Sequence, residues 1–426
     1  PLAAVTIPYT RTLTMPAGRH FLQIPGPTNV PDRVLRAIDF PTMDHRGPDF
    51  AILGREVLDG MKRVFRTSRP VVIYPASGTG AWEAALVNTL SPGDRVLMSE
   101  TGHFASLWHK MATKLGLQID LIPGDWRHGA NYAEIEARLA ADKGHSIKAV
   151  CVVHNETSTG VASRIPLVRN AIDGAKHPAL LLVDTISSLA SIDYRHDEWG
   201  VDVTVGGSQK GLMLPPGLSF NAISDKALAA HKAAKLPRSF FDWSEMIASN
   251  ATGYFPYTPA TNMLYGLREA IQMLEEEGLA NVFARHDRHA EATRRAVRAW
   301  GLEILCKDPK YYSPVLTAVV MPESHSADEF RKRWERWAPD VKLDVIVSPY
   351  RSLVVPLLRY IDAIDKSDDR PITVVLAEFV PRHWWEWLLH SQTATRLKAA
   401  LLFRPNTIVI DVPYHFEDTA DLARPR

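Results

Sequence analysis

The sequence predicts an α/β protein built on a mostly parallel sheet that is covered by helices. From about residue 70, short apolar runs alternate with helical patterns. The runs are rich in Val, Ile and Leu, which is typical of parallel strands buried on both faces. Glycine, hydroxyl or charged residues follow several of these runs, and a parallel sheet binds its ligand at the carboxyl ends of its strands. These observations indicate both the fold class and the edge of the sheet that would carry a site.

Seven strands are expected in this region. In chain order they are Val71–Tyr74, Arg95–Ser99, Gln118–Ile122, Ala149–His154, Leu180–Asp184, Val201–Val205 and Leu218–Ser224. The helical stretches between them include Ala81–Thr89, Phe104–Leu115 and Tyr132–Asp142. Two amphipathic helices, Asn262–Gly278 and Asn281–Trp300, would then lead to a smaller domain, whose first strands are expected at Leu302–Leu305 and Thr317–Met321.

This order predicts four parts of the chain. Residues 18–280 would form a large domain, residues 281–334 the start of a small domain, and residues 335–426 an atypical α/β tail. Residues 1–17 lack the basic start and apolar run of a signal peptide, and we interpret them as a leader or arm, whether native or misread. In the tail we expect strands at Leu343–Val347, Thr373–Ala377 and Thr407–Ile410. Helices are expected between them at Ser352–Ile364 and Trp384–Ala400.

Composition narrows the class of function. Hydrophobic residues make up 46% of the chain and charged residues 23%, as in an ordinary globular protein. The net charge of +1 provides no field for nucleic acid or an anionic membrane, and no apolar run reaches the roughly 18–20 residues of a membrane helix. Only two cysteines occur, Cys151 and Cys306, without the spacing of a metal site. We therefore expect a cytoplasmic protein that binds no metal, nucleic acid or membrane.

Two of the strand ends carry groups that suit an anionic, aromatic ligand. Ser77-Gly78-Thr79-Gly80 follows the first strand and begins a helix, where small residues let backbone N–H groups approach a phosphate. The alternative is an ordinary strand-to-helix turn. Asp184 ends an apolar strand, where a carboxylate can pair with a protonated pyridine nitrogen. A helix-capping role before Thr185–Ser188 is the alternative for Asp184.

Two further strand ends complete the pattern. Lys210 lies in Gly206-Gly207-Ser208-Gln209-Lys210-Gly211, and a lysine among small residues can occupy a dry pocket in which it forms a Schiff base. A surface lysine is the alternative, but the pairing with Asp184 favours the pocket. Asn155–Gly160 follows the fourth strand with hydroxyl groups that can reach a phenolic oxygen. Together the four features suit a cofactor with an aldehyde, a phosphate and a ring nitrogen.

Several long motifs, in the same order as in a known family, carry a resemblance. They are Arg19–Ile38, Asp44–Pro48, Pro75–Leu86 (PASGTGAWEAAL), His154–Val161 (HNETSTGV), Val183–Leu189 (VDTISSL) and Gly206–Phe220 (GGSQKGLMLPPGLSF). Over residues 18–334 the chain resembles the class V aminotransferases, in particular the serine–glyoxylate and alanine–glyoxylate enzymes. The resemblance implies the fold-type I architecture and pyridoxal 5′-phosphate (PLP) as cofactor.

The resemblance also implies roles for individual residues. Lys210 would form the Schiff base with PLP and later move a proton, and Asp184 would hold the pyridinium nitrogen. Phe104 would stack on the ring, and Ser158 would lie near its phenolic oxygen. The phosphate would be held by Ser77, Gly78, Thr79, Gly80 and Gln209, and by Tyr257 and Thr258 of the neighbouring subunit in a homodimer. Pro25 and Gly26 would lie by the substrate, and Trp108 is expected to be a helix-packing residue.

The implied reaction is a ping-pong transfer of the amino group of serine, or alanine, to glyoxylate. The partners are thus small amino and keto acids and a second copy of the chain. The family pattern stops after about Arg333, and the Arg-Ile-Gly segment that holds the substrate carboxylate in these enzymes occurs nowhere in the chain. Arg351, Arg359 and Arg404 are candidate replacements, and their spacing selects none of them.

The tail resembles a different class of protein. Lys342–Phe416 is similar to the soluble C-terminal region of amino-acid permeases. A natural fusion and a misjoined reading frame are both compatible with this change of pattern. The alternative function is a non-catalytic or impaired PLP-binding protein that lacks the arginine for the substrate carboxylate. A lyase or cysteine desulfurase is a third hypothesis, which neither cysteine supports. We interpret His286 and His289 as part of a solvated helix face. We interpret the three tryptophans of the tail as packing residues, namely Trp384, Trp385 and Trp387.

Overall fold

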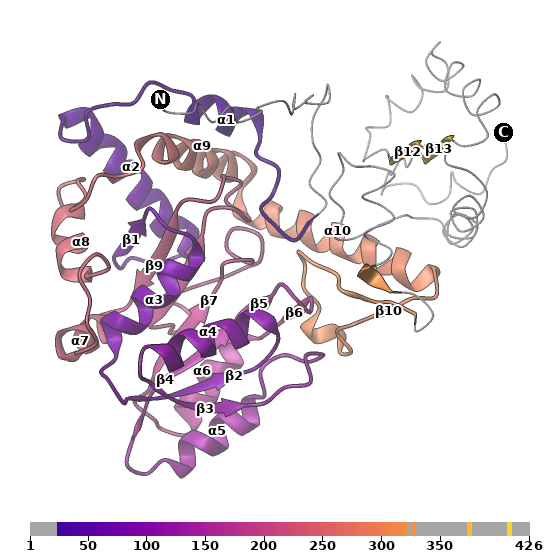
Figure 1. Ribbon diagram of the computed structural model, residues 1–426, viewed down its shortest axis with the longest axis horizontal. Helices are drawn as coiled ribbons and strands as arrows, with labels where there is room; N and C mark the ends of the chain where they lie inside the picture. Colours follow the sequence, from indigo (N-terminus) through magenta and orange to yellow (C-terminus); the bar gives the residue numbers. More distant parts are fainter. Residues whose placement is uncertain (1–23, 323–325, 329–372, 377–406, 411–426) are drawn as a thin grey trace, which may run out of the picture. The chain divides into compact units, whose positions relative to one another are not determined.

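The computed structural model describes residues 24–322 and 326–328, and the backbone of two short strands, Thr373–Leu376 and Thr407–Ile410. Its main feature is a seven-stranded sheet with the order β1-β9-β8-β7-β4-β2-β3 (Figure 1). The strands are β1 (Val71–Tyr74), β2 (Arg95–Ser99), β3 (Gln118–Ile122), β4 (Ile147–Val153), β7 (Leu180–Asp184), β8 (Val203–Gly207) and β9 (Ser219–Ile223). In this sheet β9 runs antiparallel to both neighbours, and the other pairs are parallel. The prediction of a mostly parallel α/β sheet is therefore confirmed.

Helices cover both faces of the sheet because alternate strand residues point to opposite sides. Val72 and Tyr74 of β1 pack in one buried cluster with α3 (Gly78–Thr89), α4 (His103–Lys114), α7 (Asp225–Ala233) and α8 (Trp243–Asn250). Val71 and Ile73 face the opposite cluster, built with α1 (Asp32–Ile38), α2 (Pro48–Phe65) and α9 (Thr261–Glu277). A third cluster packs α5 (Tyr132–Ala141) and α6 (Ile165–Gly174) on that same opposite face. This burial on both faces explains the continuous apolar runs of the strands.

Most predicted elements of the sheet are present with small shifts at their ends. Four strands have the predicted bounds. The strand expected at Val201–Val205 is β8, which begins two residues later and includes Gly206 and Gly207, because these glycines pair with Phe220 and Ser219 of β9. The strand expected to reach His154 ends at Val153. The two long helices are α9 and α10 (Leu279–Ala299).

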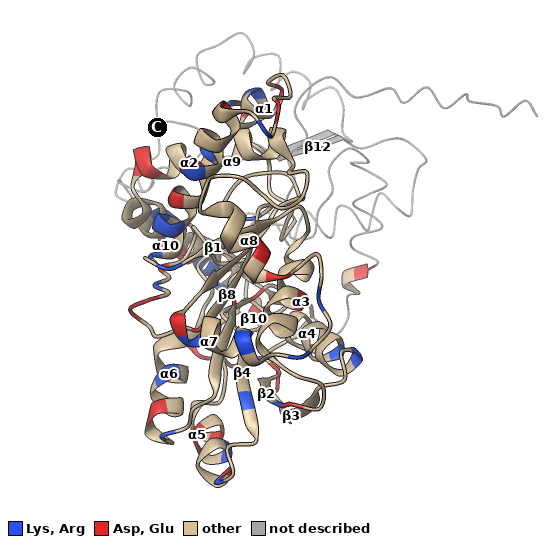
Figure 2. Ribbon diagram, turned by 90° about the vertical axis from the view of Figure 1, so that its left-hand side faces the viewer, with Lys and Arg blue, Asp and Glu red and all other residues tan. Residues whose placement is uncertain are grey.

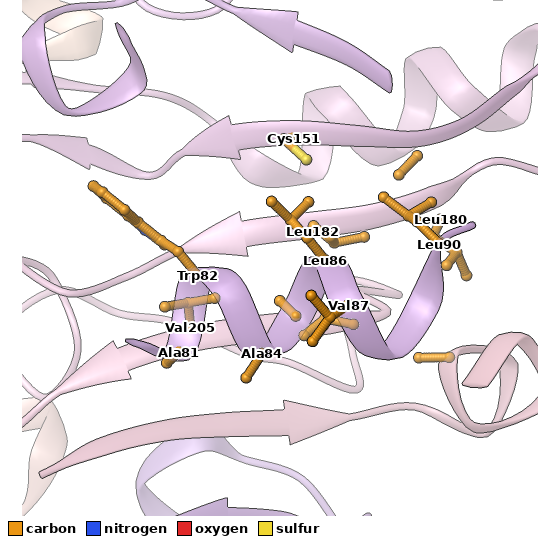
Figure 3. Packing of buried hydrophobic residues seen from close by; sticks show 14 of the residues in the cluster. Ala81, Trp82, Ala84, Leu86, Val87, Leu90, Cys151, Leu180, Leu182 and Val205 are labelled. Atoms are coloured by element: carbon orange, nitrogen blue, oxygen red, sulfur yellow. The ribbon is translucent and has the colours of Figure 1, made fainter. Parts of the chain in front are cut away.

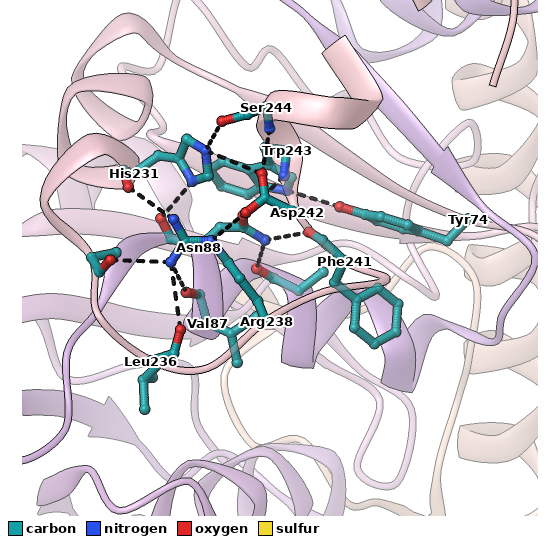
Figure 4. Close-up of polar contacts among 12 residues, drawn as sticks. Tyr74, Val87, Asn88, His231, Leu236, Arg238, Phe241, Asp242, Trp243 and Ser244 are labelled. Atoms are coloured by element: carbon teal, nitrogen blue, oxygen red, sulfur yellow. Dashed lines mark hydrogen bonds and ion pairs between the residues drawn. The ribbon is translucent and has the colours of Figure 1, made fainter. Parts of the chain in front are cut away.

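A polar network fixes the helices next to the carboxyl end of β1 (Figure 4). The Asn88 amide donates to the carbonyl oxygens of Ala84 and Phe241, and its oxygen accepts the backbone N–H of Trp243 at 3.1 Å. The indole of Trp243 donates to the hydroxyl of Tyr74, the last residue of β1. These bonds connect α3 and α8 to the strand that precedes the Ser77–Gly80 turn. The elements on both sides of the turn are therefore held in fixed positions.

The remaining short strands lie outside this sheet. β5 (Asn155–Glu156) pairs with β6 (Val161–Ala162), and β10 (Glu303–Ile304) pairs antiparallel with β11 (Val319–Val320). In the tail, β12 (Thr373–Leu376) is parallel to β13 (Thr407–Ile410). The other tail elements predicted from the sequence lie outside the described residues.

Acidic and basic residues alternate over the described helices, for example on α5 and α6 (Figure 2). Salt bridges such as Arg138–Glu134 and Arg169–Asp173 connect them within one helix face. Among the described residues, no helix has the length and apolar character needed to cross a membrane.

Candidate active site

Lys210 lies in the turn after β8, beneath the segment Ile24–Thr28. Its ammonium group donates a hydrogen bond to the carbonyl oxygen of Pro25. The same segment is fixed by the backbone N–H of Thr28, which donates to the carbonyl of Gln209 at 3.1 Å. Burial lowers the pKa of Lys210, and the carboxylate of Asp184 partly opposes this shift. A partly desolvated lysine with a lowered pKa provides more of the neutral amine that attacks a carbonyl group.

Gly26 allows the N-terminal segment to lie directly against the Lys210 side chain. Its φ of +127° is unfavourable for other residues, and a Cβ at this position would lie 2.6 Å from Cε and 2.7 Å from Cδ of Lys210. The structure therefore brings together three predicted site residues, Pro25, Gly26 and Lys210.

Replacing Gly26 with alanine is expected to displace the Lys210 side chain and to weaken PLP binding by about 10-fold or more, since a misplacement near 1 Å at a site can cost about 100-fold. Titration of the apoprotein with PLP measures this effect. Gly93→Ala is the matched control, because Gly93 also has a positive φ of +81° but a Cβ there would have no atom within 4 Å. Equal losses of PLP affinity in both variants would show that backbone strain, rather than contact with Lys210, is responsible.

Asp184 ends β7 as a buried carboxylate with 4% of its surface exposed. Its Oδ1 accepts the backbone N–H of Ile186 at 2.6 Å, and its Oδ2 accepts the indole N–H of Trp82 at 3.0 Å. Burial raises the pKa of Asp184 to about 7, although these two hydrogen bonds and the charge of Lys210 act in the opposite direction. Turns rather than an α-helix follow Asp184, so the helix-capping alternative does not hold.

The turn Ser77–Gly80 connects β1 to α3, as predicted. Within the described part of the chain, no side chain caps the start of α3, which leaves backbone N–H groups there for an anion. A Cβ on Gly78 would lie 2.6 Å from Cγ1 of Ile186, and one on Gly80 would lie 2.8 Å from Cβ of Ala76. Only glycine fits at either position, and Gly78 thereby packs against the residue that binds Asp184.

The start of α4, which carries Phe104, is held by two residues that follow β4. Glu156 has no exposed surface, and its carboxylate accepts the backbone N–H groups of Phe104 and Ala105 at 3.3 and 3.1 Å. The Ser158 hydroxyl donates to Glu156 at 2.7 Å and accepts the N–H of His103 at 2.9 Å. The structure thus brings Ser158 and Phe104 together. Through its bond to the N–H of His103, the Ser158 hydroxyl also holds the start of α4.

The remaining predicted residues are less closely joined to this group. Tyr257 donates its hydroxyl to the carbonyl of Ile73 within the same chain, and Thr258 is exposed. The side-chain oxygen of Gln209 is buried without a hydrogen-bond partner in the described part of the chain. Trp108 is fully buried, as expected for a packing residue.

These residues fit PLP at three of its functional groups. Lys210 would provide the amine for its aldehyde, Asp184 a carboxylate for its ring nitrogen, and the glycine-lined turn before α3 backbone donors for its phosphate. The charges of Lys210 and Asp184 also interact, so the two residues lie near each other.

Two residues of the site, Trp82 and Glu156, were not predicted from the sequence. Trp82 lies in Gly80-Ala81-Trp82, where an aromatic residue in a helix favours a core position, and it bonds a residue 102 positions away. Glu156 lies among hydroxyl residues that suggest a different role for the segment. Glu156 lies three residues after the apolar run Ala149–Val153, and an acidic residue so close to the end of a buried strand is the signal that could have indicated a buried carboxylate with dedicated donors.

Comparisons with known proteins identify the family of the chain. Residues 20–331 match the family Aminotransferase class-V, and residues 311–414 match the KimA potassium transporter C-terminal domain, which agrees with the permease-like tail. The chain is 50% identical to the serine–glyoxylate aminotransferase of Methylorubrum extorquens over 321 residues, which is 74% of this chain and 80% of the relative. It is 47% identical to the L-aspartate–glyoxylate aminotransferase of Paracoccus denitrificans over 306 residues, which is 72% of this chain and 77% of the relative.

The fold comparison gives the same result. The crystal structure of an alanine–glyoxylate aminotransferase from Nostoc sp. superposes with a TM-score of 0.72 at 28% identity, covering 79% of this chain and 88% of that one. This confirms the predicted fold-type I architecture. The chain therefore belongs to the class V aminotransferases, enzymes that use pyridoxal phosphate as their cofactor.

Proposed function

We propose that this protein transfers the amino group of serine, or alanine, to glyoxylate by a ping-pong reaction in which Lys210 binds the cofactor covalently. The observation that carries the proposal is the partly buried Lys210, at the carboxyl edge of the sheet, whose charge interacts with that of Asp184. The names of the relatives support the acceptor, because the Methylorubrum and Paracoccus proteins are both glyoxylate aminotransferases. Their donors differ, and the higher identity to the Methylorubrum protein favours serine.

Bound PLP supplies an aldehyde that takes up the amino group and a ring that withdraws electrons from the substrate α-carbon. Lys210 takes the α-proton and returns a proton, acting as the general base and acid, and its lowered pKa suits this role near neutral pH. Asp184 keeps the ring nitrogen protonated. Gly26 and Pro25 hold the lysine in place from above.

We further propose that the protein acts as a homodimer, in which Tyr257 and Thr258 of one subunit complete the phosphate site of the other. Thr258 is exposed, and Phe240 beside Tyr257 at 5.0 Å is an exposed aromatic residue. The large domain would end near residue 280. Val297, Trp300 and Cys306 would belong to the second domain, and they pack in a small cluster that also includes Val161 of the large domain.

The second candidate function is an impaired PLP-binding protein. The chain has no Arg-Ile-Gly, and its match to the aminotransferases ends at residue 331. Removing one partner of a buried charge pair costs about 3–5 kcal/mol, which is two to three or more decades in rate at about 1.4 kcal/mol per decade. The candidate replacements Arg351, Arg359 and Arg404 lie outside the described residues.

A desulfurase receives no support from the site. Cys151 and Cys306 are each 1% exposed, and burial raises the pKa of both thiols. A buried thiol with a raised pKa is a poor nucleophile.

The overall reaction tests the first candidate. The purified, PLP-loaded chain is incubated with glyoxylate and ¹⁵N-labelled serine, alanine or aspartate, and labelled glycine is measured. We expect labelled glycine from serine at a higher rate than from aspartate. Bound PLP without labelled glycine from any donor would favour the second candidate instead.

A further inference from the structure

Trp82 provides a side-chain hydrogen bond to the carboxylate that the cofactor site depends on. Its indole N–H donates to Oδ2 of Asp184 at 3.0 Å, while Oδ1 is occupied by the backbone N–H of Ile186. Among the described residues, no side chain other than Trp82 donates a hydrogen bond to the Asp184 carboxylate. A carboxylate has about four lone-pair sites, so two donors leave acceptor capacity for a ring N–H.

Packing leaves the Trp82 indole little freedom to move. Trp82 is 3% exposed and stacks on the fully buried Trp108, with ring centroids 5.9 Å apart and an interplanar angle of 13°. Figure 3 shows the indole projecting from the start of α3, in the cluster that also contains Leu182 and Val205 of the sheet. Burial in this cluster fixes the donor in position, because an enclosed indole cannot rotate without displacing its neighbours.

The charges around Asp184 make this donor important. The pKa of Asp184 is raised to about 7 as a net result: burial and the charge of Glu156 raise it, while the bonds from Ile186 and Trp82 and the charge of Lys210 lower it. Asp184 also interacts electrostatically with the phenol of Tyr194, whose pKa is raised chiefly by burial and further by the charge of Asp184. Near neutral pH the carboxyl is therefore close to its titration midpoint, so the loss of one donor changes its ionised fraction.

We propose that Trp82 is a positioning residue, whose indole N–H keeps the Asp184 carboxylate ionised and oriented for the ring nitrogen of pyridoxal phosphate. This inference rests on the proposed role of Asp184. It assigns to Trp82 a function beyond packing, because its indole N–H donates to the Asp184 carboxylate.

A pair of matched substitutions separates the donor from the packing. Trp82→Phe and Trp108→Phe each replace one indole of the same stacked pair by a smaller phenyl ring. The two differ in the bond that is lost, because the indole N–H of Trp108 has no hydrogen-bond partner among the described residues. At pH 6, below the titration midpoint of Asp184, we expect Trp82→Phe to weaken PLP binding by the full-length apoprotein by about 10-fold, which is the effect of a pKa raised by about one unit. Trp108→Phe should stay within about 3-fold of the wild type, which is the size of a small packing change.

The pH dependence tests the role of the donor directly. PLP affinity should fall as the pH is lowered, because Asp184 takes up a proton. Without the donor the pKa of Asp184 rises, so the midpoint of this loss should move to higher pH by about one unit in Trp82→Phe. It should not move in Trp108→Phe.

A double-mutant cycle completes the test. In an Asp184→Asn background, Trp82→Phe should change PLP affinity by less than about 3-fold if the indole acts through the carboxylate. An unshifted midpoint in Trp82→Phe, or a full loss of affinity in the Asp184→Asn background, would overturn the proposal. The measurement needs no amino transfer, so a wild type that binds PLP but forms no glycine would refute the proposed function and leave this result standing.

Discussion

Replacing Lys210 with alanine is expected to abolish amino transfer while the fold remains intact. Lys210 is the proposed covalent attachment point and the proton carrier, and general acid–base catalysis alone contributes about 100- to 10,000-fold. We therefore expect the rate of glycine formation to fall by at least about 1,000-fold. The loss of a partly buried ammonium group should not destabilise the apoprotein, because burial already disfavours its charge.

Borohydride reduction followed by peptide mass mapping checks the attachment point. PLP should become covalently bound to the peptide that contains Lys210 in the wild type and to no peptide in Lys210→Ala. Lys62→Ala is the control, since Lys62 is a partly exposed residue paired with Asp59 on α2. Partial recovery of Lys210→Ala by added ethylamine would support the proton-carrier role. Covalent label on another lysine in the wild type would contradict the assignment.

Asp184→Asn is expected to lower the rate by about 100-fold or more, because breaking a buried charge pair costs about 3–5 kcal/mol. An amide of the same shape cannot keep a ring nitrogen protonated. Single-turnover measurements with serine check this effect on the chemical step. A rate within a few-fold of the wild type would show that the carboxylate does not act on the cofactor ring.

The same substitution should stabilise the apoprotein at neutral and higher pH. Because the pKa of Asp184 is raised from 3.8 to about 7 by burial, the folded state binds a proton more tightly than the unfolded state. The wild type therefore loses stability from about pH 4 to pH 7, by up to about 4 kcal/mol for a shift of this size. Asp184→Asn avoids this loss, so its melting temperature should exceed that of the wild type at pH 8 and approach it near pH 4.

Local sequence patterns were sufficient to predict the sheet and the strand ends that carry the proposed site. Leu180–Asp184 and Val71–Tyr74 are fully buried strands, so each is a continuous apolar run with a sharp end. The residues that follow such ends lie at one edge of a parallel sheet, which is why the sequence alone could assign Asp184 and Lys210 to one site.

Long-range contacts could not be predicted in the same way. The bond from Trp82 to Asp184 and the contact of Gly26 with Lys210 join residues far apart in the chain, and no local pattern encodes which pairs meet. The assignment of Gly206 and Gly207 to β8 likewise depends on pairing with β9. The homodimer and the roles of Tyr257 and Thr258 stay predictions.

The visible absorbance of the PLP-loaded protein tests most directly whether amino transfer persists in a chain without Arg-Ile-Gly. The spectrum is recorded before and after serine is added, and again after glyoxylate. We predict that serine converts the band of bound PLP to that of pyridoxamine phosphate, and that glyoxylate restores it. A band that depends on Lys210 but does not change with serine would contradict the claim, and would mean that the chain holds its cofactor without a working substrate site.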